Sequence, residues 1–187
     1  NHNATLDARR LVTFIGYNFN DKTSFISEIE LEHVKETYVE QAFLSHSIKN
    51  NFSVNAGLML IPMGIQNMYH EPPTFNGVER TNVDKYIVPT TWREMGISVN
   101  GRIFDNEVNY ELMIVNGFNG YDGDGVFNGS SGLRNGRQKG SKSYMTSPDF
   151  ASRFSYGGIP NLSLGLSTYF GESESTAYNE LDLSDEN

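Results

Sequence analysis

Apolar and polar residues alternate along eight segments of the chain, and this period of two is the pattern of a half-buried β-strand. The clearest segment is Thr23–His33, in which Ile26, Glu28, Glu30 and Glu32 fall on the face opposite Phe25, Ser27, Ile29 and Leu31. The predicted strands are Leu6–Tyr17, Thr23–His33, Tyr38–Ile48, Ser53–Ile61, Trp92–Phe104, Val108–Ile114, Asp149–Tyr156 and Leu162–Phe170.

A helix is the competing prediction for Ile26–Phe43, because Glu, Leu, Lys and Ala favour helices. The apolar positions there do not keep a 3.6-residue stripe, whereas a period of two holds to Leu31. We therefore predict strands. In the strand Tyr38–Ile48, alternation puts Glu40 on the face of Ala42 and Leu44.

The connections between the predicted strands differ strongly in length. Short turns at residues 18–22, 49–51, 105–107 and 157–161 contrast with long insertions at about 62–91 and 117–147. Connections in compact domains are mostly about 4–6 residues, whereas outer-membrane barrels have short turns at one end and long loops at the other. The predicted strands also have about the length that a tilted strand needs to cross a bilayer. The pattern thus favours an all-β, antiparallel transmembrane β-barrel.

Composition changes this picture little. The longest apolar stretch, Ala56–Ile65, contains Pro62, so the sequence predicts no membrane-spanning helix. The net charge of −9 disfavours a nucleic-acid partner, and the absence of cysteine excludes disulfides and thiolate metal sites. The chain begins without Met and ends in a polar run. We expect one domain, truncated at both ends, that is part of a larger barrel.

Alternation also assigns the two faces of the predicted sheet. The apolar series Phe52, Val54, Ala56, Leu58 and Leu60, with Val108, Tyr110, Leu112 and Ile114, is predicted to face lipid. The predicted lumen-lining residues are Glu28, Glu30, Glu32, Glu94, Asn100, Arg102, Asn109, Glu111 and Arg153. Aromatic residues near strand ends, including Trp92 and Phe118, suit interfacial girdles; alternatively, they are core residues at the edges of a β-sandwich.

Other motifs have simpler interpretations than catalysis. Asp122 and Asp124 have the spacing that begins many calcium loops, but Val126 occupies a ligand position and no Glu closes the loop. We expect no metal and no cofactor, and the basic segment Gly136–Lys142 is predicted to be a solvated loop. The Glu28, Glu30 and Glu32 row is interpreted as ion-lining or as salt-bridge partners of arginines. Residues predicted to anchor the first long loop are His70, Glu71, Glu79, Arg80, Trp92 and Arg93.

Three segments, Ala56–Gly64, His70–Arg80 and Ile87–Gly96, resemble the porin-like outer-membrane barrels related to the phosphate-selective porins O and P. The resemblance runs from about residue 9 to 171, and its most specific part is the first long insertion. It implies a bacterial outer-membrane channel. The predicted interior is acidic on the early strands, however, and an anion-selective pore needs a basic lumen, so phosphate selectivity does not follow.

The sequence therefore predicts a non-enzymatic, porin-like channel for small solutes or ions, with outer-membrane lipid as its surroundings. Two alternatives stay open. The barrel could be an accessory or structural part of a larger outer-membrane complex, with other outer-membrane proteins or copies of itself as partners. The chain could instead be a soluble secreted β-sandwich that binds carbohydrate.

Overall fold

A computed structural model describes residues 6–75, 77, 80–120, 127, 132–145 and 147–172. The described residues form one eight-stranded antiparallel sheet, which confirms the all-β, antiparallel prediction. Its strands are β1 (Arg10–Asn18), β2 (Thr23–Glu32), β3 (Glu36–Lys49), β4 (Phe52–Leu60), β5 (Arg93–Ile103), β6 (Val108–Val115), β7 (Asp149–Ile159) and β8 (Leu162–Phe170).

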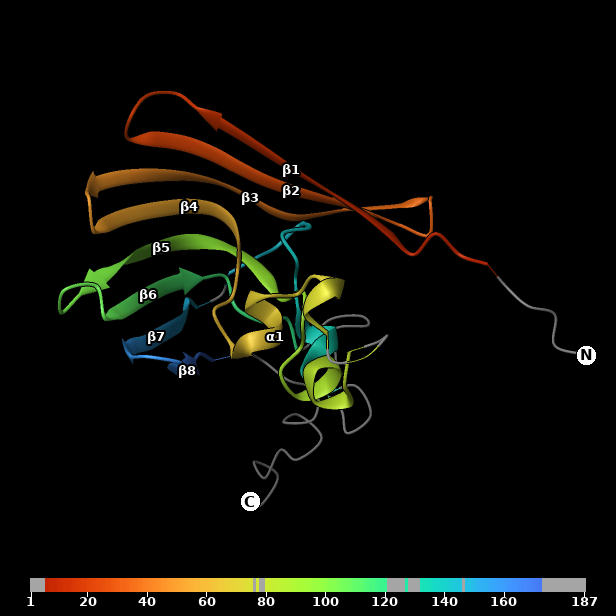
Figure 1. Ribbon diagram of the computed structural model, residues 1–187. Coiled ribbons are helices and arrows are strands. Elements are labelled where there is room, and N and C mark those ends of the chain that lie inside the picture. The colour runs from red at the N-terminus through yellow and green to blue at the C-terminus, as the bar shows by residue number, and fades with distance from the viewer. Residues whose placement is uncertain are drawn as a thin grey trace, which may run out of the picture.

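Every strand pairs with its neighbours in sequence, in the order β1 to β8. Among the described residues the sheet is not closed, and β1 and β8 are its edges. Figure 1 shows the sheet arching over the two long insertions. The short turns β1–β2, β3–β4, β5–β6 and β7–β8 lie at the opposite end, whereas the short β2–β3 turn lies at the end of the insertions. The predicted asymmetry between short turns and long loops is therefore present in the fold.

The predicted strands match the observed strands closely, including β2 and β3, where a helix was the competing prediction. Two boundaries differ by more than two residues. β1 begins at Arg10 instead of Leu6, and β7 continues to Ile159, so the turn predicted at 157–161 shrinks to Pro160 and Asn161. Gly157 and Gly158 are thus strand residues, and the pairing of β7 with β8 shifts register after Tyr156.

A β-bulge changes the predicted orientation of one acidic residue. Glu28 pairs with Gln41 and Ile29 pairs with Val39, so Glu40 has no partner residue on β2. A bulge of this kind re-aims a side chain because the extra residue breaks the alternation. Glu40 is buried and forms an ion pair with Arg93, instead of sharing the face of Ala42 and Leu44.

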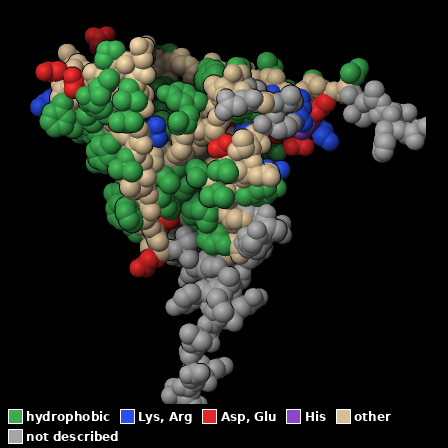
Figure 2. All heavy atoms as spheres, turned by 60° about the horizontal axis from the view of Figure 1, so that its bottom comes forward, with side chains coloured by type: hydrophobic (Ala, Val, Ile, Leu, Met, Phe, Trp, Pro, Cys, Tyr) green, Lys and Arg blue, Asp and Glu red, His purple; other side chains and the backbone are tan. Residues whose placement is uncertain are grey.

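The two faces of the sheet differ in chemistry. We call the face that carries Glu28, Asn55 and Met113 the inner face, and the opposite face the outer face. One row of paired residues crosses the outer face from edge to edge: Tyr17, Phe25, Leu44, Ala56, Ile97, Ile114, Phe150 and Phe170. All eight are apolar or aromatic. Phe25 is partly exposed, and the other seven are exposed. Figure 2 shows hydrophobic side chains spread over much of the visible surface.

In the described parts of the long insertions, the helical segments are short. The first holds α1 (Gly64–Met68), a 3-10 turn (Pro72–Thr74) and a π-helical turn (Val83–Ile87), and the second holds a 3-10 turn (Arg134–Gly136). None of the helices in the described part of the chain is long and apolar enough to span a membrane. The buried core lies where these insertions meet the sheet, and consists of Met59, Ile61, Trp92, Met113, Val115 and Ala151.

Three apolar assignments from the sequence are wrong at this junction. Leu58 is buried instead of exposed, because Gly140 of the second insertion lies against its side chain. Trp92 is also buried and stacks on Phe118, so these two aromatic residues belong to the core beneath the loops and not to an outward girdle.

Candidate functional site

Two regions divide the inner face. At one end the described parts of the insertions, residues 61–75, 80–92, 116–120 and 132–145, cover the sheet, and we call them the loop layer. At the other end lies a hollow of about 930 Å³ that opens toward the short turns. The chemistry of each region follows from whether a loop covers the strand residues.

Asn67 of α1 closes the neck of the first insertion. Its side-chain Nδ2 donates to the carbonyls of Ile61 (2.7 Å) and Trp92 (3.0 Å), and the Trp92 backbone N–H donates to Asn67 Oδ1 (2.8 Å). Asn67 is fully buried, so each of these bonds satisfies a group that water cannot reach. This side chain, together with the backbone hydrogen bond from the Ile61 N–H to the Trp92 carbonyl (2.9 Å), joins the two ends of the loop.

Glu94, at the start of β5, performs the same role for the second insertion. Its carboxylate accepts hydrogen bonds from the Asn116 side chain (3.0 Å) and from the Gln138 backbone N–H (3.0 Å). Asn116 also accepts a bond from the Met95 backbone N–H (2.8 Å). Glu94 lies on the inner face, but it is fully buried in the loop layer and does not line the hollow.

Arg137 joins the two insertions to each other. Its Nη1 donates to the carbonyl of Thr90 (2.6 Å) and to the carbonyl and hydroxyl oxygens of Thr91 (3.2 and 3.0 Å), while Nε donates to the Arg134 carbonyl (2.8 Å). Burial, and then the neighbouring Arg134 and Arg93, lower the pKa of Arg137 to about 9, so the guanidinium stays charged at neutral pH. The segment Gly136–Lys142 is therefore partly buried, and its prediction as a solvated loop is wrong for Arg137.

Aromatic rings fill the space between these polar bonds. The Trp92 ring stacks on Phe118 with centroids 4.5 Å apart, and lies 4.7 Å from the Tyr169 ring of β8. The Tyr169 hydroxyl donates to the Asp149 carboxylate at 2.6 Å. Trp92 therefore connects the first insertion to the far edge of the sheet.

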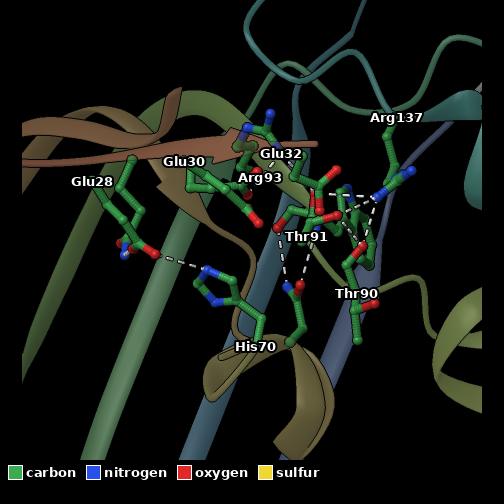
Figure 3. A network of polar contacts seen from close by, with 12 residues as sticks. Glu28, Glu30, Glu32, His70, Thr90, Thr91, Arg93 and Arg137 are labelled. Carbon is green, nitrogen blue, oxygen red and sulfur yellow. Dashed lines mark hydrogen bonds and ion pairs between the residues drawn. The ribbon is translucent and has the colours of Figure 1, made fainter. Parts of the chain in front are cut away.

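A second cluster lies on the inner face of β1 to β3. Figure 3 shows His70 pointing from the first insertion toward Glu28 of β2, with their Nε2 and Oε1 atoms 3.1 Å apart. Gln41 of β3 donates to the other oxygen of Glu28 at 2.8 Å. Burial opposes protonation of His70, but the hydrogen bond and the charge of Glu28 outweigh it and raise the pKa of His70. Burial, and then Glu28, raise the pKa of Glu71.

Arginines neutralise the other carboxylates of this cluster. Arg10 of β1 forms ion pairs with Glu30 and Glu32, and Arg93 pairs with Glu40 at 2.9 Å. Arg80 donates to the His70 carbonyl at 3.4 Å and lies over the Phe75 ring. Burial, and then Arg10 and Arg134, lower the pKa of Arg80.

The hollow contains the remaining lumen-lining candidates. Asn100, Arg102, Asn109, Glu111 and Arg153 all line it, together with serines of β7 and β8 and residues of α1. Arg102 and Asn109 are exposed, and Arg153 donates to Ser167 at 2.9 Å. These five predicted residues thus share one space, whereas Glu28, Glu30, Glu32 and Glu94 lie in or beside the loop layer.

The predicted loop-anchoring residues also divide. His70, Glu71, Arg80, Trp92 and Arg93 come together between the first insertion and the strands. Glu79 and the calcium candidates Asp122 and Asp124 lie outside the described residues. Sequence reasoning missed Glu40, Asn67, Asn116, Arg137 and Gln138. Their contacts join segments that are distant in the sequence. Short motifs containing Glu40, Asn116, Arg137 and Gln138 resemble the porin-like barrels, but nothing in those motifs indicates which residues they contact.

No family model matches the sequence. The chain is 37% identical over 173 residues to an uncharacterized protein of Aquifex aeolicus, and the alignment covers 88% of this chain. The chain spans only 38% of the length of that relative. The comparison identifies a longer related protein, and the function has to be argued from the site.

Proposed function

We propose that this chain forms part of a transmembrane β-barrel in a bacterial outer membrane and acts there as a porin-like channel for small solutes or ions. The observation that carries the proposal is the apolar row that crosses the outer face through all eight strands, from Tyr17 to Phe170. Monomeric soluble proteins rarely expose a large contiguous apolar patch, whereas lipid surrounds such a band in an outer-membrane barrel.

The inner face supports the same proposal. Outer-membrane barrels have a polar interior, and residues that face lipid alternate with residues that face the lumen. The hollow is lined by Asn100, Arg102, Asn109, Glu111 and Arg153, and it provides a polar surface for a hydrated solute. The loop layer lies on the same face and would narrow the passage at one end. No catalytic residue is assigned in this proposal.

We infer weak ion selectivity for the channel. Charged side chains set selectivity when one sign dominates the narrow part of a pore. Among the described residues in and against the loop layer, acidic and basic side chains are mixed, with Glu28, Glu30, Glu32, Glu40, Glu71 and Glu94 beside Arg10, Arg80, Arg93, Arg134, Arg137 and Lys139. Phosphate selectivity is for this reason not part of the proposal.

The test is single-channel recording of the purified full-length protein in planar bilayers. Discrete conductance steps are expected, and replacing Asn109 by Trp should reduce the step size because the side chain extends into the hollow. The matched control is Phe104→Trp, which changes an exposed turn residue. Absence of conductance, together with stable co-purifying proteins, would support the accessory-barrel alternative.

Behaviour in detergent separates the soluble alternative from both barrels. A β-sandwich buries its apolar strand faces between two sheets, whereas the described residues supply one sheet and leave its outer face exposed. The membrane proposal predicts that the full-length protein aggregates when detergent is removed. A protein that stays monomeric in plain buffer contradicts it.

A further inference from the structure

We propose that Glu28, His70 and Glu71 form a binding site for a divalent first-row metal ion, with Zn²⁺ as the favoured ion, and that the metal fastens the first insertion to β2. The proposal does not depend on channel activity. It differs from the sequence prediction, which expected no metal.

The three side chains converge from separate parts of the fold. His70 and Glu71 follow α1 in the first insertion, and Pro72 and Pro73 fix the backbone directly after them. Glu28 comes from the inner face of β2. One ligand atom from each residue lies within 4.8 Å of the other two, with His70 Nε2 at 3.1 Å from Glu28 Oε1 and 3.9 Å from Glu71 Oε1.

These distances suit tetrahedral zinc. Imidazole nitrogen and carboxylate oxygen both bind Zn²⁺ at roughly 2.0–2.2 Å, which places two ligand atoms about 3.3 Å apart. The two separations from His70 Nε2, 3.1 and 3.9 Å, lie on either side of this value. Three protein ligands leave the fourth position for water.

Burial and charge favour a cation at this place. Glu28 and His70 are almost completely buried, and Glu71 Oε1 is a buried oxygen with no hydrogen-bond partner. In the part of the chain that the structure describes, no Lys or Arg side chain forms an ion pair with Glu28 or Glu71, since Arg10 pairs with Glu30 and Glu32. Two carboxylates around one imidazole leave negative charge that a divalent ion neutralises.

Gln41 provides the orienting contact that metal sites usually have. It donates to Glu28 Oε2 at 2.8 Å and leaves Oε1 turned toward His70. Mutation of a residue that orients a metal ligand in this way typically lowers metal affinity about 10–100-fold.

The first test is a calorimetric titration of Zn²⁺ into chelator-treated full-length protein in detergent. The second is the visible absorption spectrum of the same protein loaded with Co²⁺. We expect one ion per chain, intense Co²⁺ bands typical of tetrahedral coordination, and slower proteolysis of the first insertion when zinc is present. His70→Asn and Glu71→Gln should each weaken binding at least about tenfold, as should Gln41→Ala.

Matched controls are His46→Asn and Glu107→Gln, which alter a histidine and a glutamate away from the cluster and should leave the affinity unchanged. The tetrahedral Co²⁺ spectrum is recorded on the unaltered protein, so it does not depend on any variant folding. Wild-type protein that binds no zinc below millimolar concentration overturns the proposal. An unchanged Zn²⁺ affinity in both His70→Asn and Glu71→Gln also overturns the proposal, because the ion would then bind at another place.

Discussion

The loop layer and the hollow occupy the same face of the same sheet, yet they use polar residues in opposite ways. Glu94 and Asn116 are buried, and each is held by hydrogen bonds between the sheet and an insertion. Arg102 on β5 and Asn109 on β6 stay exposed to the hollow, whereas Glu94 lies on β5 and Asn116 directly follows β6. Alternation determines the face, and coverage by a loop determines whether a polar residue is structural or free to contact solute.

This difference has an energetic side. A buried polar group that loses its partner costs about 1–3 kcal/mol, whereas exposed substitutions usually change stability by less than about 0.5 kcal/mol. Stability should therefore respond strongly to changes in the loop layer and weakly to changes around the hollow. The following substitutions test that contrast.

The largest effect is expected from Trp92→Ala. The side chain is buried and lies against both Phe118 and Tyr169, so its removal leaves a cavity at the centre of the core. We expect a loss of about 3–5 kcal/mol in the free energy of unfolding, measured by denaturant titration of the full-length protein in detergent. The control Phe104→Ala removes an exposed ring and should cost far less. Equal losses in the two variants would contradict the contrast.

Asn67→Ala should have the next largest effect. It removes three hydrogen bonds at the neck of the first insertion and leaves the buried Trp92 N–H without its partner, whereas the carbonyls of Ile61 and Trp92 still accept from the N–H groups of Met63 and Ile61. The expected loss is about 2–3 kcal/mol, accompanied by faster proteolysis within residues 62–91. Asn109→Ala is the matched control, because Asn109 is exposed in the hollow. A neutral Asn67→Ala would show that packing and the backbone hydrogen bond between Ile61 and Trp92 hold the neck without Asn67.

Arg137→Lys tests the bond between the two insertions. Lysine keeps the charge but cannot reproduce the fork that reaches Thr90, Thr91 and Arg134. We expect a loss of about 1–2 kcal/mol and increased hydrogen exchange in both insertions. Lys142→Arg, in an exposed part of the same segment, should change neither quantity. If exchange rises in the second insertion only, Arg137 does not couple the two.

The smallest effect concerns pH. Partial burial, and then Arg137, Arg93 and Arg134, lower the pKa of Lys139 to about 8 from its ordinary value of 10.5. Because the folded-state pKa lies below the unfolded one, the unfolded chain binds more protons between these values, and stability should rise slightly as pH increases from about 8 to 10.5. Much of Lys139 still contacts solvent, which screens these interactions and keeps the gain small.

If the chain conducts ions, the same deprotonation should also make the channel more cation-selective above about pH 8, which the reversal potential would report. Lys139→Met removes the titrating group and should flatten both pH dependences in this range. A wild-type profile identical to that of Lys139→Met would show that Lys139 does not titrate there. Reversal potentials under a salt gradient and urea titrations at several pH values provide the measurements.

The strands were predictable because alternation is a local signal. β2 illustrates this well, since its glutamates favour a helix by propensity but their spacing fits only a strand with one polar face. The five residues of the hollow followed from the same rule, because alternation on adjacent paired strands places them on one face. For these residues, the sequence alone was sufficient to assign the face of the sheet.

The loop layer could not be predicted in this way. Arg137 looked like a solvated residue because it lies in a polar, glycine-rich segment, and only the fold brings it to the carbonyls of Thr90 and Thr91. Glu40 was assigned to the wrong face because a bulge interrupts the alternation of β3. Contacts between residues far apart in sequence, and single-residue irregularities in a strand, leave no periodic trace.

The pairing of every strand with its sequence neighbours has a consequence for how such a protein changes in size. A hairpin added beyond β1 or β8 would extend the sheet without altering any of the seven existing pairings. The circumference of a closed sheet grows with its number of strands. Duplication of a single hairpin is therefore a direct route to a wider protein of the same design, with the loop layer and its buried bonds inherited intact.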